Sequence, residues 1–383
     1  MNLCDLITKL GPAMVLIVPS NRTIVLHQTS NTMRITIKYA KLDTIVVRKD
    51  GVKFCNGKGL LVKLNGLNAW CRVITLSLND CELRADGAKE IARALRVNST
   101  LQTLNLWGNL VRADGAKEIA EALRKNSTLQ HLDLGHNDVQ DDGAREIAAA
   151  LRVNSTLQTL KLDNNYVGAV GAGAIADALY VNTTLRTLNL KYNDMRADGA
   201  QEIATALREN STLRTLNLGC NGVEDDVAGE IAGALRVNST LQTLNLEYND
   251  MGDDGAREIA AALRVNSTLV KLKLSHNGIG TVGAREIAEA LRVNNTLREL
   301  DLGCNGVGDD GAREIAEALH VNSTLQHLDL GINRVGNDGH GKFVSLGVIE
   351  KELYKSNICL YKNVFIFISY NFIYFFKSLR IKN

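Results

Sequence analysis

The chain has 383 residues, enough for two or three compact domains, and its hydrophobic content of 45% is ordinary for a globular protein. The formal net charge of +2 hides a basic start (+8 over residues 1–72), an acidic middle (−11 over 73–339) and a basic end (+5 over 340–383). The acidic middle excludes a nucleic-acid groove there, because phosphate binding needs clustered lysines and arginines.

Residues 1–72 are predicted to form a basic, β-rich module. The segments RITIKYA (34–40) and DTIVVRK (43–49) alternate in polarity as strands do, and Asp50-Gly51 suits a hairpin turn. Two interpretations stay open, a small cap over the next part of the chain and a basic docking module. The apolar run 13–18 is too short for us to expect a cleaved signal peptide. Seven cysteines, an odd number without C-x-x-C spacing, favour reduced thiols and a cytoplasmic protein.

A 28-residue repeat occupies the middle of the chain. The pair Leu-x-Leu at 76–78 recurs at constant spacing up to 328–330, without insertion or deletion. Three residues after the second leucine comes an asparagine, replaced only in the first copy by Cys81, and two further on an aliphatic residue. The string L-x-x-L-x-L-x-x-N/C-x-L is the leucine-rich-repeat signature, and it stands at 101–111 as LQTLNLWGNLV. We predict ten leucine-rich repeats over 73–339, the last incomplete.

Each repeat is predicted to contain a strand and a helix. Leu104 and Leu106 put apolar side chains on the inner side of a strand, while Trp107 faces out. Asn109 turns inward at the strand end, where its amide can bond backbone groups of adjacent repeats. The segment GAKEIAEALR (115–124) carries apolar residues at helical spacing. Asp114, which precedes it, is the predicted helix N-cap.

The sequence Asn98-Ser99-Thr100 satisfies the N-glycosylation pattern and recurs every 28 residues up to Asn322. Because Asn98 follows the helix end ALRV, we predict that it ends the helix in the left-handed conformation that asparagine tolerates. The acceptor pattern is then a by-product of a helix C-cap.

Strands pack more closely than helices, so a stack of such units must curve, with strands inside and helices outside. The 28-residue unit resembles the ribonuclease-inhibitor-like class of leucine-rich repeats, and NSTLQTLNLxxNxVxxDGAxEIAxALRxN is similar to the repeats of NOD-like receptors. The resemblance implies an α/β solenoid, a horseshoe with parallel strands on the concave face and helices on the convex face. The P-loop of NOD-like receptors is missing: CNGKGLLVK (55–63) fails its spacing.

Residues 340–383 form a divergent basic and aromatic tail that the repeat pattern does not explain. We expect this tail to be disordered or truncated. Its apolar run 364–376 is shorter than the roughly 20 residues of a spanning helix, so we do not expect membrane insertion.

Function is predicted from the positions that vary between otherwise uniform copies. Two columns directly after the strands gather Trp, Tyr and His, which are the anchors of protein interfaces, although drift at exposed positions explains them as well. Acidic residues near the strands should attract a protein partner with a basic surface. The predicted partner-binding residues are Trp107, His136, Asp163, Tyr192, Glu247, Tyr248, His276 and Asp301.

The sequence also permits two enzymatic interpretations. His276 and Cys304 share a column one repeat apart, about 5 Å, which invites a Cys/His pair or a metal site. No third group orients the histidine, so we predict no catalytic residue, metal or cofactor. The alternative is a GTPase-activating protein similar to Ran GTPase-activating protein, with Arg84 or Arg112 supplying positive charge. The uniform repeats favour a non-catalytic scaffold that binds a protein through its concave face and strand-exit rim.

Overall fold

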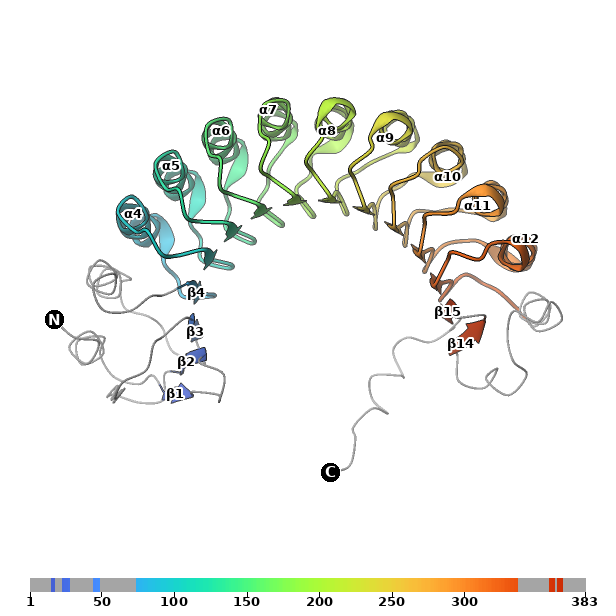
Figure 1. Cartoon of the computed structure of the whole chain (residues 1–383), viewed down its shortest axis with the longest axis horizontal. Coiled ribbons are helices and arrows are strands. Elements are labelled where there is room, and N and C mark those ends of the chain that lie inside the picture. Colours follow the sequence, from blue (N-terminus) through green and yellow to red (C-terminus); the bar gives the residue numbers. More distant parts are fainter. Residues whose placement is uncertain are drawn as a thin grey trace. The chain divides into compact units, whose positions relative to one another are not determined.

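The computed structural model describes residues 74–336 continuously, together with short strands at 15–17, 23–27, 44–48, 358–361 and 364–367. The chain divides into two units, Met1–Asn193 (unit 1) and Asp194–Asn383 (unit 2), and each is described by itself. In both units a short strand alternates with a helix, and the helices lie along the outer side of the strands (Figure 1).

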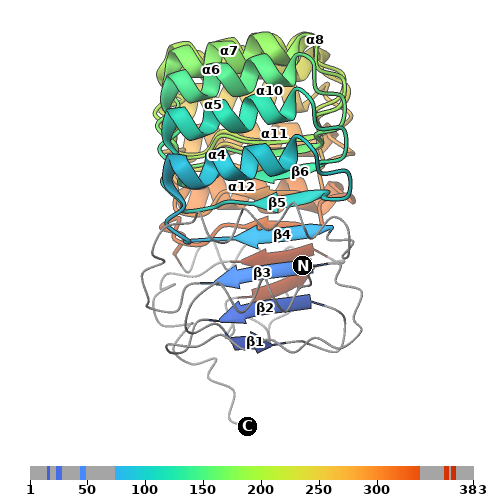
Figure 2. The same ribbon diagram turned by 90° about the vertical axis from the view of Figure 1, so that its left-hand side faces the viewer.

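Unit 1 contains eight strands and four helices in its described part. Strand β1 pairs antiparallel with β2, and every following pair is parallel. Figure 2 shows α4 to α7 stacked side by side over these strands. The elements are β1 Val15–Ile17, β2 Thr23–His27, β3 Thr44–Arg48, β4 Thr75–Leu78, α4 Arg84–Leu95, β5 Thr103–Asn105, α5 Arg112–Leu123, β6 His131–Asp133, α6 Gln140–Leu151, β7 Thr159–Lys161, α7 Ala169–Leu179 and β8 Thr187–Asn189.

Unit 2 contains seven strands and five helices in its described part. Strands β9 to β13 are parallel, β13 pairs parallel with β15, and β15 pairs antiparallel with β14. The elements are α8 Arg196–Glu209, β9 Thr215–Asn217, α9 Asp225–Val237, β10 Thr243–Asn245, α10 Gly252–Leu263, β11 Lys271–Lys273, α11 Thr281–Val293, β12 Glu299–Asp301, α12 Gly308–Val321, β13 His327–Asp329, β14 Ile358–Tyr361 and β15 Val364–Phe367.

The predicted fold class, an α/β leucine-rich-repeat solenoid, is confirmed. Strand pairing keeps the 28-residue register, so that Leu104 lies opposite Leu76 on one side and Leu132 on the other. Leu104 and Leu106 are buried, as are the apolar helix positions, including Ile119. The leucines of each repeat therefore contact their equivalents in the next, which is how units too small to bury their own apolar stripe share one core.

The flanking segments are described only in part. The predicted strand in DTIVVRK is confirmed as β3, whereas RITIKYA and the Asp50-Gly51 turn lie outside the described residues. The tail contributes β14 and β15, and β15 continues the sheet of unit 2. The roles of residues 1–72 and 340–383 stay predictions.

Close packing between helices explains the glycine in the first turn of most helices. A Cβ atom on Gly115 of α5 would lie 2.7 Å from the Val111 side chain and 2.8 Å from Ala88 of α4. Atoms cannot approach so closely, so only glycine lets these two helices stack at this spacing.

The predicted N-cap is wrong. Helix α5 begins at Arg112, directly after Val111, and Asp114 lies inside its first turn without a capping hydrogen bond. Its charge still complements the helix dipole there. Caps come instead from the preceding repeat: an Asp141 Oδ1 atom accepts the N–H of Gly171 in α7 at 2.5 Å. The backbone turns into the helix three residues earlier than expected, at Arg112 instead of Gly115.

The predicted conformation of the sequon asparagines is also wrong. Asn238, which follows α9, has φ −72° and ψ 124°, an extended backbone rather than a left-handed one. Its Oδ1 atom accepts the N–H groups of Thr240 (3.0 Å) and Leu241 (2.8 Å), and its Nδ2 atom donates to the carbonyls of Leu207 (2.7 Å) and Asn210 (2.9 Å). The asparagine is structural, but because of its side-chain bonds and not its φ angle.

The inward-turning asparagine at the strand end behaves as predicted. Asn109 is fully buried and donates from Nδ2 to the carbonyls of Leu78 and Leu106, both at 2.7 Å. Its Oδ1 atom accepts the N–H of Cys81 in the preceding repeat at 2.9 Å. Each such asparagine thus satisfies backbone groups of two repeats that would otherwise be buried without partners.

Candidate partner-binding surface

The loops that leave the strands have an unusual backbone. Non-glycine residues with positive φ recur there, among them His136 (56°), Tyr192 (57°), Tyr248 (55°) and His276 (55°). A left-handed backbone costs a non-glycine residue about 1–2 kcal/mol, and Gly, Asn and Asp bear it most easily. In unit 2 none of those three types occupies this column, whose members are Cys220, Tyr248, His276, Cys304 and Ile332.

In unit 1 the structure brings three predicted site residues together. The rings of Trp107 and His136 stack with centroids 5.2 Å apart and an interplanar angle of 21°. Gly135 lies between Trp107 and Asp163, because a Cβ atom there would come within 2.6 Å of Trp107 Cδ1 and 2.9 Å of Asp163 Oδ2. The Nδ1 atom of His136 lies 2.6 Å from the Asn164 Nδ2 atom, which orients the imidazole. Trp107, His136 and Asp163 therefore form one continuous aromatic and acidic patch.

Asp163 carries a perturbed carboxyl group in this patch. Burial raises its pKa above the usual value, and the neighbouring charge of Asp133 adds to the effect. The Nδ2 atom of Asn189 donates to Asp163 Oδ1 at 2.8 Å. Tyr192 projects from a later repeat of unit 1 and is half exposed, with the Lys191 ammonium 5.1 Å from its ring centroid.

In unit 2 a second aromatic pair occupies the strand exits. Tyr248 and His276 stack almost parallel, with centroids 3.9 Å apart and an interplanar angle of 12°, while Tyr248 keeps 48% of its surface exposed. Desolvation raises the Tyr248 pKa, and the charges of neighbours including Cys304, Cys220, Glu247 and Asp301 raise it further.

The sequence predicts that Glu247 exposes its charge to a partner, but the structure places this side chain differently. It lies two residues beyond β10, is only 9% exposed and accepts a bond from Asn245 Nδ2 at 2.9 Å. Its Oε1 atom forms an ion pair with Lys273 Nζ at 2.8 Å. In unit 1 Asp133, which stands two residues earlier in its repeat than Glu247 does, pairs with Lys161 at 3.2 Å. Lysines on the adjacent strand therefore offset part of the predicted acidity.

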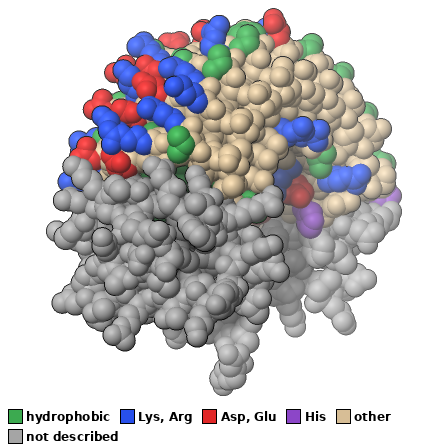
Figure 3. Space-filling view, turned by 60° about the vertical axis from the view of Figure 1, so that its left-hand side comes forward, with side chains coloured by type: hydrophobic (Ala, Val, Ile, Leu, Met, Phe, Trp, Pro, Cys, Tyr) green, Lys and Arg blue, Asp and Glu red, His purple; other side chains and the backbone are tan. Residues whose placement is uncertain are grey.

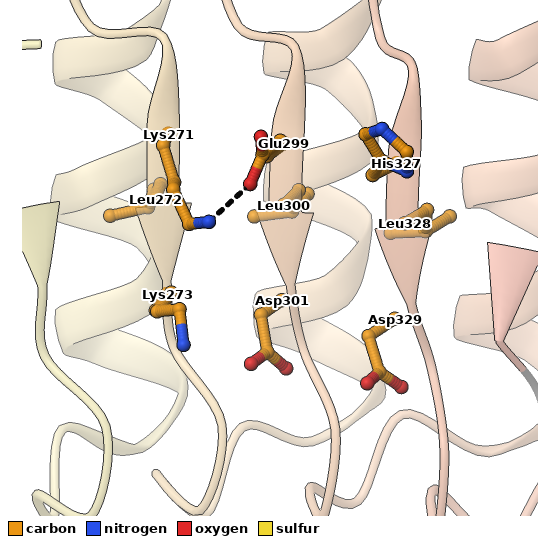
Figure 4. Close-up of a pocket in the computed structure, with 9 residues that line it drawn as sticks. All are labelled: Lys271, Leu272, Lys273, Glu299, Leu300, Asp301, His327, Leu328 and Asp329. Carbon is orange, nitrogen blue, oxygen red and sulfur yellow. Dashed lines mark ion pairs between the residues drawn. The ribbon is translucent and has the colours of Figure 1, made fainter. Parts of the chain in front are cut away.

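The strand face of β11 to β13 contains a hollow of about 180 Å³ (Figure 4). Lys271 is paired with Glu299 at one end, and the carboxylates of Asp301 and Asp329 lie side by side at the other. Burial raises the pKa of Asp301, and the charge of Glu247 raises it further, against the bond from the Gly303 N–H (3.0 Å). Burial likewise raises the pKa of Asp329, with the charge of Asp301 adding to it.

Sequence reasoning missed several exposed apolar side chains on the same rim. Tyr166 is 67% exposed and Leu110 is 46% exposed, both with positive φ in a column two residues beyond that of Tyr192. Ile332 extends the column of Tyr248. Leu110 and Tyr166 share one further loop column of unit 1, and its large apolar residues were the available signal.

The helix face has a different electrostatic character. Arginines at the ends of helices pair with glutamates of the next helix, as in Arg124–Glu146 (3.1 Å) of unit 1 and Arg264–Glu286 (2.9 Å) of unit 2. Figure 3 shows basic and acidic side chains interspersed over part of the surface. Paired charges of this kind give a helix face little net attraction for a charged partner.

The residues considered for the two enzymatic interpretations have no unusual environment that would favour catalysis. His276 stacks on Tyr248, and burial raises the pKa of the neighbouring Cys304 thiol, which disfavours the reactive thiolate. Within the described residues, no group of three or more His, Cys, Asp or Glu side chains is placed to hold a metal ion. Arg84 and Arg112 are exposed first residues of α4 and α5. No helix among the described residues has the length and apolar character that crossing a membrane requires.

The solved structures that resemble the chain include the following three. Leiomodin-1 Actin-Binding Site 2 is 24% identical, covering 40% of this chain and 88% of its own, with a TM-score of 0.36. The leucine-rich repeat-containing protein LegL7 from Legionella pneumophila is 17% identical, with coverage of 73% and 85% and a TM-score of 0.46. An internalin from Listeria monocytogenes is 15% identical, with coverage of 74% and 80% and a TM-score of 0.44.

Family comparisons agree with the repeat architecture. The model described as Leucine Rich repeat matches residues 97–120, 125–148, 153–176, 293–316 and 321–343. The model described as TMOD/LMOD Leucine-rich domain matches residues 191–283. No curated protein matches at a significant level. The repeat spacing, the family matches and the strand–helix units together identify the chain as a leucine-rich-repeat protein.

Proposed function

We propose that this protein is a non-catalytic scaffold that binds a protein partner through its strand face and strand-exit rim, and that the partner surface is basic. The observation that carries the proposal is the set of exposed aromatic side chains on left-handed strand-exit loops, including Trp107–His136 and Tyr248–His276. Large amphipathic rings of this kind dominate binding energy at protein interfaces.

Two contrasts support the choice of face. The helix face carries arginine–glutamate pairs in register, whereas Asp301 and Asp329 on the strand face have no ion pair among the described residues. The rim keeps bulky residues where the backbone favours glycine or asparagine, which a merely structural loop does not need. Only the repeat type favours the alternative of a GTPase-activating protein, and that alternative is not part of the proposal.

We further propose a cytoplasmic location and membership of the ribonuclease-inhibitor-like class, with repeats of the NOD-like receptor type. Free thiols at Cys220 and Cys304 support the first, since disulfides are rare in that compartment. The second is supported by the full helix that follows each strand from β4 to β12, as in the twelve-residue helix α5.

The experiment is a capture of partners on the immobilised full chain, followed by binding kinetics with the purified partner. Trp107→Ala and Tyr192→Ala should each raise the dissociation rate, with a loss of ~2 kcal/mol for a hot spot. Tyr180→Ala is the matched control, because Tyr180 is an equally exposed tyrosine at the end of helix α7. Actin is included as a probe because residues 191–283 match the tropomodulin and leiomodin domain model.

The outcome that contradicts the proposal is equally specific. If Tyr180→Ala and the helix-face variant Glu121→Gln weaken binding while the rim variants leave it unchanged, the helix face is the binding surface. Activation of GTP hydrolysis by the wild-type chain, lost in Arg84→Ala or Arg112→Ala, would establish the enzymatic alternative instead.

A further inference from the structure

The acidic end of the β11–β13 hollow and the aromatic rim of unit 2 meet at one side chain. Asp301 lies beside Asp329 on the adjacent strand, and its Oδ1 atom accepts the N–H of Gly303 (3.0 Å), whose carbonyl in turn accepts the N–H of His276 (3.0 Å). A pair of neighbouring carboxylates therefore lies one strand away from the His276 side of a parallel stack of two rings, one of which is half exposed.

The remaining charges of the hollow are already matched. Lys271 pairs with Glu299, and Lys273 pairs with Glu247, so each lysine of the hollow has a carboxylate partner. Asp301 and Asp329 accept backbone N–H groups of Gly303 (3.0 Å) and Gly331 (2.8 Å), which leaves further acceptor positions on each carboxylate. The unmatched charge is negative, and Figure 4 shows both carboxylates at the same end of the hollow.

The rim beside this hollow is built at a cost in backbone energy. Tyr248, His276 and Cys304 succeed one another in one column with φ of 55°, 55° and 54°. The same left-handed angle recurs at Asp80, His136 and Ile332, so the loop imposes it on whichever residue stands there, and at Tyr248 and His276 it holds two stacked rings at the strand exit. This observation is independent of the charges.

We propose that this surface binds an arginine side chain of the partner, with the guanidinium between the Asp301 and Asp329 carboxylates and the Tyr248–His276 stack. A guanidinium is planar, presents several N–H donors to carboxylates and stacks on aromatic faces. A lysine ammonium meets the charge requirement but is a compact point charge without a face to stack. The inference rests on the proposed function and names the chemistry that the partner must contribute.

The test uses the full chain and three labelled probe peptides, hexaarginine, hexalysine and hexacitrulline, followed by fluorescence anisotropy. We expect hexaarginine to bind about tenfold more tightly than hexalysine, and the uncharged, shape-matched hexacitrulline not to bind measurably. Asp301→Asn should weaken hexaarginine binding by about tenfold. Tyr248→Leu should remove most of the preference for arginine over lysine.

Two features keep these variants interpretable. Asparagine occupies the equivalent position of β5, β9 and β10, where it makes the same bond to the N–H two residues on, as in Asn217 to Gly219 (3.0 Å). Asp301→Asn should therefore fold, which a thermal melt will verify. Asp133→Asn is the matched control, since Asp133 makes the same bond to Gly135 (3.0 Å) in unit 1 but is paired with Lys161.

The outcomes separate this inference from the function on which it rests. Equal affinity for hexaarginine and hexalysine, or equal losses in Asp301→Asn and Asp133→Asn, would mean general charge attraction and overturn the arginine site. A partner that needs Trp107 and Tyr192 but tolerates Asp301→Asn would leave the scaffold function standing while removing this inference.

Discussion

At the scale of single residues, one amino acid performs two tasks in every repeat. Asn109 and its equivalents bond the backbone of adjacent strand exits, and Asn238 and its equivalents bond the backbone of adjacent helix ends. The Asn109 amide uses both its donor and its acceptor across a repeat boundary, whereas the Asn238 amide donates to the preceding repeat and accepts from Thr240 and Leu241 beside it. The sequon at Asn238 therefore coincides with a buried structural amide whose Nδ2 atom is already engaged.

The first prediction concerns Asn238→Gly. A left-handed helix end would make glycine nearly neutral, but the extended backbone and lost side-chain bonds predict destabilisation by about 1–3 kcal/mol. Urea unfolding measures it. Thr240→Ala is the control, because it abolishes the glycosylation pattern and leaves the Asn238 amide in place. If Thr240→Ala destabilised as much as Asn238→Gly, the amide bonds would not be the cause.

The second prediction concerns Asp301→Asn and pH. Burial raises the Asp301 pKa in the folded chain above its usual 3.8 and the charge of Glu247 adds to this, although the Gly303 N–H, Lys273 and His276 oppose it. The folded state then binds the proton more tightly than the unfolded state, so ionised Asp301 lowers stability above its folded pKa. This cost disappears as the pH falls below 3.8.

Asp301→Asn should accordingly be more stable than the parent at pH 7, and the difference should shrink as the pH falls through the acid range. Unfolding curves of both proteins at several pH values test this. Asp133→Asn should give no gain at pH 7, because it removes the attraction to Lys161. A gain for Asp301→Asn that stays constant with pH would show that titration is not its source.

At the scale of elements, a helix depends on the repeat before it. Helix α11 begins after Gly280, which has no side chain to cap it, and Asp253 of α10 supplies the bonds instead. The Asp253 Oδ1 atom accepts the N–H groups of Gly280 (2.8 Å) and Gly283 (2.7 Å). Capping thus links consecutive helices, in addition to the leucine core that links consecutive strands.

The third prediction follows from this cap. Asp253→Ala should destabilise by about 0.5–2 kcal/mol, the usual cost of a lost N-terminal cap. The adjacent Asp254 is exposed and pairs only with Arg257 at 2.6 Å, so Asp254→Ala should cost about 0.2–0.5 kcal/mol. Chemical denaturation compares the two. Equal losses would indicate that both residues act only through the helix dipole.

At the scale of the whole molecule, net charge is distributed by face as well as along the chain. The repeats are acidic overall, yet arginine–glutamate pairs bind up much of the charge on the helices. Asp163, Asp301 and Asp329 lie among strand-side groups whose burial keeps their pKa values raised. An approaching basic surface is therefore attracted mainly to the strand side.

The fourth prediction is kinetic. Asp163→Asn should slow association of the basic partner with little change in dissociation, because long-range charge acts on encounter. The difference should fade near 1 M salt, where the Debye length is about 3 Å. Stopped-flow association at two salt concentrations measures it, with Glu121→Gln as a helix-face control. A salt-independent effect of Asp163→Asn would point to a short-range contact instead.

The sequence alone determined the architecture and the core. A constant 28-residue period imposes the same strand, turn and helix on every copy, so burial of Leu104, Asn109 and Ile119 could be read from spacing. The apolar periodicity of a strand or a helix depends on residues a few positions apart, and a single repeat contains all of these positions. For the same reason the rim was located correctly after the strands.

Only the tertiary structure decided the bonds that cross repeats. The cap from Asp253, the pairing of Glu247 with Lys273 and the two bonds that the Asn238 amide donates join residues that are distant in sequence. Which side chains meet across a boundary depends on backbone angles that composition does not specify, such as the extended φ of Asn238 and the left-handed φ of Tyr248. Those angles are set by packing against the neighbouring repeat, and no single repeat contains that information.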